Sequence, residues 1–274
     1  MTEAQNKSNA YIGFGTYKLK GEIATKSVLT ALNVGYRHID TATLYKNEIF
    51  VGHAISNTNI NRSELFLTTK ISNSDQIKGK NYVLNSFASS LADLKTDYID
   101  LLLVHNPIKG KIIDTWQVVE YLFAHKKCLQ VGVSNFLVED LDWFFSTSGC
   151  LYSTIAKPTT NQIELSPYNT QLDVVKYCHS NNIRIEAHTS LTRGTKLNDP
   201  KLVSIAKSNN MSTPELLLKW GLQNNYTILP RSSDEKKISA NFNLDMINNM
   251  ITDENMYVLN NDFNENYCLI KRRI

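Results

Sequence analysis

Short apolar runs alternate with longer segments of helical periodicity along almost the whole chain. This alternation is typical of repeated strand–helix units, in which buried parallel strands are connected by helices that cover the sheet. Eight apolar runs have the length of strands, at residues 12–16, 36–41, 65–71, 98–105, 129–134, 160–164, 183–188 and 227–230. Helical periodicity occurs between them, at residues 23–33, 82–94, 112–124, 138–145, 172–180 and 214–223. Eight strands with intervening helices predict a (β/α)8 TIM barrel of the α/β class.

The chain length of 274 residues fits one such barrel. No glycine- or proline-rich linker divides the sequence, so we expect residues 1–274 to form a single (β/α)8-barrel domain. A doubly wound open sheet is the alternative fold. Its nucleotide-binding fingerprint is incomplete, because Gly13 and Gly15 are followed by Lys18 where a third glycine belongs.

Composition excludes several classes of protein. Hydrophobic residues make up 42% and charged residues 20%, which suits a soluble core, and every apolar run is shorter than the ~18 residues of a membrane span. Residues 1–10 are polar and lack a signal-peptide pattern, so we expect a cytoplasmic protein. The four cysteines have no metal-ligand spacing, and a net charge of +3 is far from that of a nucleic-acid binder. We expect no metal, membrane or nucleic-acid partner, and a monomer.

Ionisable side chains interrupt the apolar strands at their ends. Asp40, Lys70 and His105 each end one predicted strand, and Tyr45 follows Asp40 in the loop before a helix that opens near Lys46. In a parallel barrel all strand ends of this kind meet at the C-terminal face, where active sites of this fold lie. We therefore expect these four side chains to converge in one cleft.

An Asp, a Tyr, a Lys and a His in one cleft form a proton-transfer set. A tyrosine with its reference pKa of about 10 donates a proton readily at neutral pH only if a nearby cation favours the phenolate. Lys70 has that charge, Asp40 can keep the ammonium ionised, and His105 can hydrogen-bond a carbonyl oxygen. Taken singly, each residue could instead form a structural ion pair or a buried hydrogen bond. A lyase or isomerase with a Schiff base on Lys70 is a further alternative.

Several motifs resemble the aldo-keto reductase family. The segment GYRHIDTATLYKNE at 35–48, followed by Val51 and Gly52, is similar to the family signature around its catalytic Asp and Tyr. The segments LTTK at 67–70, DLLLVH at 100–105, GVSNF at 132–136, NQIE at 161–164 and LPRS at 229–232 occur in the family's order. The resemblance spans residues 12–241 and implies Asp40, Tyr45, Lys70 and His105 as the catalytic tetrad, with Tyr45 as the general acid.

The resemblance also implies NADPH as cofactor. Residues at matching positions would bind the nicotinamide carboxamide, the nicotinamide ring, the 2′-phosphate and the adenine of NADPH. They are Thr16, Ser134, Asn135, Gln162, His188, Thr189, Leu191, Arg231, Ser232, Lys237 and Asn241. Arg231 and Lys237 fall at the position of the 2′-phosphate, and two cations there favour NADPH over NADH. Without the preceding LPRS motif, the segment at 234–237 could be an ordinary solvated charge run.

The chain departs from the family pattern at several positions. His188 stands where the family stacks a larger aromatic ring on the nicotinamide, and Lys237 replaces an arginine. Asn106 and Tyr17 occupy substrate-pocket positions that are often Trp, which predicts a wider and more polar pocket. The expected function is NADPH-dependent reduction of an aldehyde or ketone. The alternative is a nucleotide-binding regulatory barrel without significant turnover, which the intact tetrad disfavours.

Overall fold

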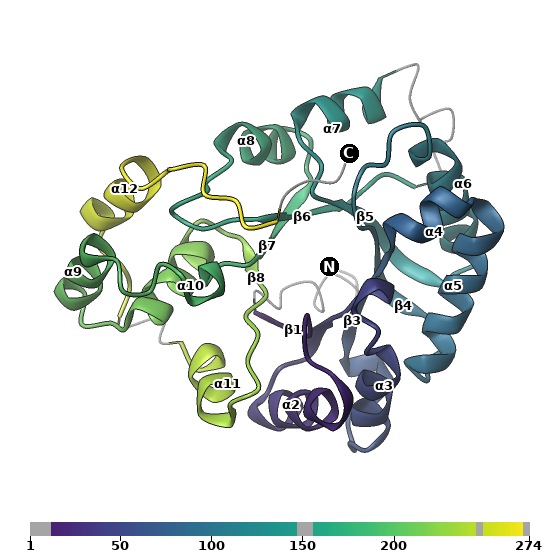
Figure 1. Ribbon diagram of the computed structural model, residues 1–274, viewed down its shortest axis with the longest axis horizontal. Coiled ribbons are helices and arrows are strands. Elements are labelled where there is room, and N and C mark those ends of the chain that lie inside the picture. The colour runs from purple at the N-terminus through teal and green to yellow at the C-terminus, as the bar shows by residue number, and fades with distance from the viewer. Residues whose placement is uncertain (1–11, 147–155, 245–248, 271–274) are drawn as a thin grey trace.

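The structure is a computed structural model that describes residues 12–146, 156–244 and 249–270. Eight parallel strands follow one another in sequence order around a ring, with helices outside it (Figure 1). The strands are β1 (Gly13–Gly15), β2 (His38–Asp40), β3 (Phe66–Ile71), β4 (Ile99–Val104), β5 (Cys128–Ser134), β6 (Thr160–Glu164), β7 (Arg184–His188) and β8 (Thr227–Ile228). Each observed strand overlaps one predicted strand and extends at most one residue beyond it. The expected (β/α)8 barrel is therefore confirmed.

The ring closes between the last strand and the first. Ile12 forms a parallel bridge with Ile228, and the Gly15 amide donates to the Pro230 carbonyl at 3.0 Å. A Cβ atom on Gly15 would lie 3.0 Å from the Leu229 carbonyl oxygen, so the missing side chain lets the two backbone segments approach closely. The G-x-G pattern therefore serves close approach of backbone at the barrel seam, and the doubly wound alternative is wrong.

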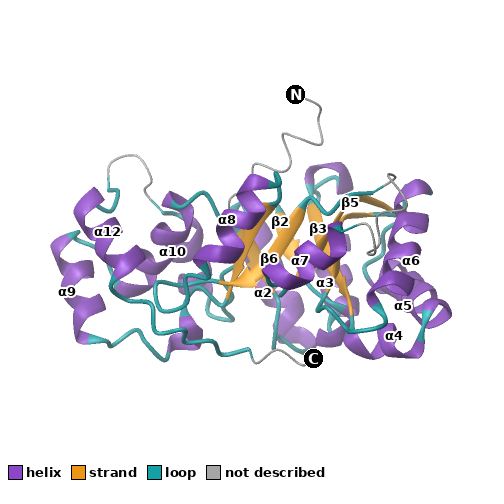
Figure 2. Ribbon diagram, turned by 90° about the horizontal axis from the view of Figure 1, so that it is seen from above, coloured by secondary structure: helices purple, strands orange, loops and turns teal. Residues whose placement is uncertain are grey.

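Helices flank the strands in the side view (Figure 2). They are α2 (Gly21–Val34), α3 (Glu48–Ser56), α4 (Asn73–Lys78), α5 (Lys80–Asp93), α6 (Ile112–Ala124), α7 (Val138–Phe145), α8 (Leu172–Ser180), α9 (Pro200–Ser208), α10 (Thr213–Gln223), α11 (Glu235–Phe242) and α12 (Asp253–Asn261). Short 3-10 helices occur at η1 (Thr43–Tyr45), η2 (Arg62–Glu64) and η3 (Thr192–Gly194). All six predicted helices are present, with ends within two residues of the prediction. Over the described ranges, no helix combines the length and apolar character needed to cross a membrane.

Alternate side chains of each strand share one face, and this period places the polar residues inside the barrel. The outward faces pack against the helices in one large apolar core. Inside, Phe66, Leu101 and Leu103 form a small apolar cluster. Polar side chains also occupy the interior, as shown by the contact of His38 with Thr68 on the neighbouring strand. The barrel interior therefore contains both apolar and polar side chains. The C-terminal ends of the strands form the mouth of the barrel.

Candidate active site

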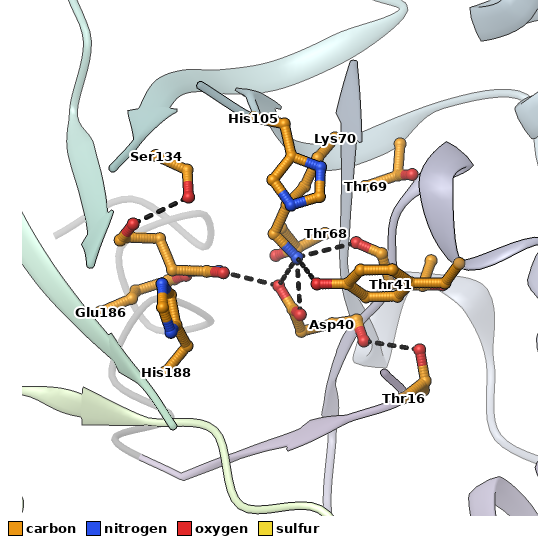
Figure 3. A network of polar contacts seen from close by, with 12 residues as sticks. Thr16, Asp40, Thr41, Thr68, Thr69, Lys70, His105, Ser134, Glu186 and His188 are labelled. Atoms are coloured by element: carbon orange, nitrogen blue, oxygen red, sulfur yellow. Dashed lines mark hydrogen bonds and ion pairs between the residues drawn. The ribbon is translucent and has the colours of Figure 1, made fainter. Parts of the chain in front are cut away.

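The four tetrad residues come together at the C-terminal mouth of the barrel. Asp40 is the last residue of β2, Lys70 is the penultimate residue of β3, and His105 directly follows β4. Tyr45 ends η1, in the connection between β2 and α3. Asp40, Lys70 and His105 point toward one another in Figure 3, as strand-end residues of a parallel barrel should.

Lys70 lies at the centre of this group and is fully buried. Its Nζ donates to both carboxylate oxygens of Asp40 at 2.7 Å, to the carbonyl of Thr41 at 2.9 Å and to Oη of Tyr45 at 3.4 Å. The ammonium has three hydrogens, and Asp40 with Thr41 provides the shortest contacts. Lys70 is thus held in place by Asp40 and directed at the Tyr45 hydroxyl.

The Tyr45 ring is positioned by two other rings and by its own loop. The Tyr17 ring lies 5.1 Å away at an interplanar angle of 56°, and the His105 ring lies 5.9 Å away at 75°. The η1 turn is tied to β3 because Thr43 Oγ1 donates to the Lys70 carbonyl at 3.0 Å. Tyr45 remains partly exposed as a residue, and its ring is in contact with both neighbouring rings.

A buried asparagine that the sequence analysis did not single out fixes the same loop. Asn47 accepts a hydrogen bond from Thr41 Oγ1 at 2.9 Å, and its Nδ2 donates to the carbonyls of Thr16 and Leu19 at 2.9 and 3.0 Å. These bonds join the loops that follow β1 and β2. Asn47 therefore supports the backbone on both sides of the tetrad without contacting Tyr45.

Protonation in the tetrad follows from burial and from the two charges. Burial raises the pKa of Tyr45, and the nearby Lys70 ammonium offsets part of this rise. Burial alone would lower the pKa of Lys70, but Asp40 and Tyr45 together raise it above its usual value. Tyr45 therefore keeps its proton at neutral pH, while Lys70 stays an ammonium. A permanently protonated amine is a poor nucleophile, which argues against the Schiff-base alternative.

His105 is neutral and offers free hydrogen-bonding capacity. Burial, with Lys70 and His188 adding to it, lowers the pKa of His105 to about 3. Its Nδ1 is buried and has no hydrogen-bond partner among the described residues. A buried ring nitrogen without a hydrogen-bond partner is uncommon in folded proteins.

The predicted carboxamide-binding residues form a connected polar cluster beside the tetrad. Ser134 Oγ donates to the Gln162 carbonyl at 2.8 Å and accepts from Asn135 Nδ2 at 3.1 Å. Asn135 Nδ2 also donates to the His105 carbonyl at 3.1 Å. Its Oδ1 therefore faces His188, whose Nε2 lies 3.0 Å away and must carry the proton, while Nδ1 accepts from Thr189 Oγ1 at 3.0 Å. The His188 ring is fixed along both edges.

Gln162 has partners that the sequence analysis did not anticipate. Its Nε2 donates to Asp40 Oδ2 at 2.8 Å and to Glu186 Oε2 at 2.8 Å. Glu186 is buried on β7, two residues before His188. The period of a strand puts residues two apart on the same face, so this spacing was the signal that could have found Glu186.

The four residues predicted for the adenosine side follow β8. Arg231 and Lys237 are exposed and form no ion pair within the described part of the chain. Arg231 Nε donates to the Tyr17 carbonyl at 3.0 Å. Ser232 Oγ accepts from the Asp234 amide at 3.0 Å, at the start of α11.

The remaining predicted residues lie around the same mouth or behind it. Thr16 Oγ1 donates to the Asp40 carbonyl at 2.9 Å, and Asn106 Nδ2 donates to Asn73 Oδ1 at 2.9 Å. Leu191 is partly buried against the apolar core, and Asn241 is buried on α11. Thr16 therefore supports the tetrad backbone, and Asn106 presents an amide beside the His105 strand end.

A further buried histidine lies below the tetrad. His38 contacts Thr68 Oγ1 at 3.0 Å and is 2% exposed. Burial lowers the pKa of His38 to about 4, although Asp40 opposes this effect. In the unfolded chain histidine has a pKa of about 6.5, so between these values only the unfolded state takes up this proton.

This difference predicts an acid sensitivity. The contribution of His38 to stability is present above about pH 6.5 and is lost as the pH falls toward the folded-state pKa, by about 1.4 kcal/mol per pH unit. We expect the stability advantage of the wild type over His38→Gln to shrink by about 2 kcal/mol between pH 7 and pH 5. Urea unfolding of both proteins at each pH measures it, and parallel profiles would contradict the assignment.

The fold is a (β/α)8 barrel, and its polar site lies at the C-terminal ends of the strands. The model of the aldo/keto reductase family matches residues 11–259. Glyoxal reductase of Bacillus subtilis (strain 168) is 39% identical over 232 residues, which are 84% of this chain and 81% of that protein. Methylglyoxal reductase DkgB of Salmonella typhi is 34% identical over 232 residues, or 84% of either chain.

A solved structure agrees with these sequence comparisons. An aldo-keto reductase from a Medee basin deep-sea metagenome library has a TM-score of 0.86 at 32% identity, covering 96% of this chain and 94% of that one. The chain therefore belongs to the aldo/keto reductase family, whose members are oxidoreductases that act on carbonyl groups.

Proposed function

We propose that this chain reduces aldehyde or ketone groups to alcohols with NADPH, and that Tyr45 is the general acid. The observation that carries the proposal is the Lys70 ammonium, which lies 2.7 Å from both Asp40 oxygens and 3.4 Å from Tyr45 Oη. This arrangement stabilises the phenolate that forms when Tyr45 gives up its proton.

Each tetrad residue has a separate task in this proposal. Tyr45 transfers its proton to the carbonyl oxygen as that oxygen gains negative charge, and Lys70 stabilises the phenolate left behind. Asp40 keeps Lys70 protonated and holds its ammonium close to the Tyr45 hydroxyl. His105, which is neutral, orients the carbonyl oxygen with a hydrogen bond from its unpaired ring. Because Tyr45 is partly exposed, its phenolate can regain a proton from solvent after the alcohol leaves.

The chemistry of the donors around the mouth fits NADPH. When bound, NADPH supplies the hydride that reduces the carbonyl carbon. Ser134, Asn135 and Gln162 would hold its carboxamide, with His188 against the ring and Thr16, Thr189 and Leu191 nearby. Arg231, Ser232 and Lys237 would hold the 2′-phosphate and Asn241 the adenine. The unpaired cations Arg231 and Lys237 suit a dianionic phosphate.

We propose a small carbonyl compound as the substrate, with Tyr17 and Asn106 at the pocket. Two similar proteins are named for their reduction of glyoxal and methylglyoxal, which are small dicarbonyls. Asn106, which directly follows His105, would add a polar side chain to this pocket, with its Nδ2 bonded to Asn73 Oδ1. A panel of aldehydes and ketones followed at the NADPH absorbance band tests this proposal, and no turnover with any of them would leave the regulatory alternative.

We expect NADPH to bind at least tenfold more tightly than NADH, a difference of about 1.4 kcal/mol. The 2′-phosphate adds charge-assisted contacts that NADH cannot make. Fluorescence titration of the wild type with both nucleotides measures the preference. Arg231→Met and Lys237→Met should each reduce it, whereas Lys236→Met, a neighbouring exposed lysine on α11, should leave it unchanged. Equal dissociation constants for NADPH and NADH in the wild type would contradict the cofactor assignment.

The regulatory alternative needs the nucleotide site but no working acid. The directed contact between Lys70 and Tyr45 favours the enzyme, because a binding protein has no use for a stabilised phenolate. A single domain over residues 1–274, a cytoplasmic location and a monomeric state complete the proposal.

A further inference from the structure

Glu186 is a buried carboxylate at the barrel mouth that none of the proposed steps uses. It lies on β7 between Arg184 and His188 and is 5% exposed. Its Oε2 accepts a hydrogen bond from Gln162 Nε2 at 2.8 Å. A carboxyl group buried in such a site destabilises the fold unless a partner compensates for its lost hydration. The contact of Glu186 with Gln162 therefore indicates its role.

The Gln162 amide is restrained from two sides. One side-chain hydrogen points to Glu186 and the other to Asp40 Oδ2, each at 2.8 Å. An amide nitrogen has only two hydrogens, so both are used. Turning the amide over would place Oε1 against the oxygens of Asp40 and Glu186, and both hydrogen bonds from Nε2 would be lost. Glu186 and Asp40 together therefore allow one orientation of the Gln162 amide.

The backbone of Gln162 is fixed as well. Gln162 pairs with Ser134 across β5 and β6, and Ser134 Oγ donates to the Gln162 carbonyl at 2.8 Å. No donor among the described residues reaches Oε1 of Gln162. The result is an acceptor oxygen of fixed orientation, next to Ser134 and Asn135.

We propose that Glu186 is a positioning residue that, with Asp40, presents Gln162 Oε1 as an acceptor for the carboxamide NH2 of nicotinamide. The inference rests on the proposed function, because it assumes that the nucleotide binds at this mouth. It makes Glu186 a determinant of selectivity for a carboxamide over a ring substituent that lacks N–H donors. Without Glu186, the Gln162 amide would be restrained only by Asp40. Both carboxylate oxygens of Asp40 already accept hydrogen bonds from Lys70.

The test compares NADP⁺ with its 3-acetylpyridine analogue, in which a methyl group replaces the carboxamide NH2. Dissociation constants are measured by calorimetry without substrate, so the readout is binding and not turnover. We expect the wild type to bind NADP⁺ at least ~10-fold more tightly than the analogue. Glu186→Met, which lacks an acceptor of comparable strength, should reduce this ratio to about twofold or less. Glu186→Gln should keep most of the ratio, because its own Oε1 can accept from Gln162.

A double-mutant cycle separates positioning from a general effect of the substitution. Gln162→Met should lose the preference, and adding Glu186→Met to it should change the ratio no further. Glu48→Leu is the matched control, since Glu48 is another buried carboxylate, bonded to Thr69 and Ser90 on the outer side of the barrel. Its ratio should equal that of the wild type. If Glu186→Met does not fold, Glu186→Leu replaces it.

The outcomes separate the two proposals. An unchanged ratio in folded Glu186→Met, or a further loss in the Gln162→Met background, would overturn the positioning role while leaving the proposed function intact. Failure of the wild type to bind either nucleotide would instead overturn the proposed function.

Discussion

Replacement of Tyr45 with phenylalanine is expected to lower turnover by ~10²- to 10⁴-fold, the usual effect of losing a positioned proton donor. The substitution removes one oxygen, which accepts a hydrogen bond from Lys70 Nζ at 3.4 Å. The ring contacts with Tyr17 and His105 remain, so NADPH affinity and melting temperature should stay near those of the wild type.

Steady-state reduction of an active aldehyde, beside a cofactor titration of both proteins, measures this effect. Tyr257→Phe is the matched control, because Tyr257 is exposed on α12 and the same atom is removed. Full activity in Tyr45→Phe would remove Tyr45 from the mechanism. Loss of activity in both variants would point to an unrelated effect of the substitution.

The barrel could be predicted because each strand is a short apolar run bounded by a helical segment. Six of the eight predicted strands were longer than the paired ones, because an apolar run can extend beyond the residues that form strand hydrogen bonds; β6 matched its prediction and β5 is one residue longer. At β8 the assigned strand ends at Ile228, although the Leu229 amide still donates to the Ala187 carbonyl and the Pro230 carbonyl accepts from Gly15. The helices missed by periodicity include α9, whose start is marked in the sequence by Asp199 and Pro200 at the cap.

The tetrad could be predicted because parallel strands bring their ends to one face. Asp40, Lys70 and His105 needed only the register of three strands, and Tyr45 needed the family resemblance. Asn47 and Glu186 were missed for a different reason. Their partners lie far apart in sequence, and the pairing of neighbouring strands, β1 with β2 and β6 with β7, brings Asn47 to Leu19 and Glu186 to Gln162.

The position of Gln162 and the orientation of its side-chain amide are determined by different features of the protein. The resemblance gives Gln162 a position near a carboxamide, but it does not show which end of the amide faces outward. That choice depends on the carboxylates of Asp40 and Glu186, which lie on two other strands. The orientation of the Gln162 amide is determined by tertiary contacts, so the sequence motif does not predict it.

Replacement of Lys70 with methionine is expected to abolish most turnover and also to destabilise the fold. Without the ammonium, the Tyr45 phenolate loses its stabilising charge, so turnover should fall at least as far as in Tyr45→Phe. The Asp40 side chain is only 5% exposed and would lose both of its 2.7 Å contacts with Lys70. Removing one partner of a buried ion pair destabilises by about 3–5 kcal/mol, because the other charge is left uncompensated.

A second substitution separates the two losses. In Lys70→Met with Asp40→Asn, no buried charge is left unpaired, and the Asn oxygen can still accept from Gln162 Nε2. The double variant should therefore recover much of the stability lost in Lys70→Met, as measured by urea unfolding, while turnover stays as low as in the single variant. Recovered activity in the double variant would mean that Lys70 only neutralises Asp40, because a group that stabilises the phenolate cannot be replaced by removing the charge beside it.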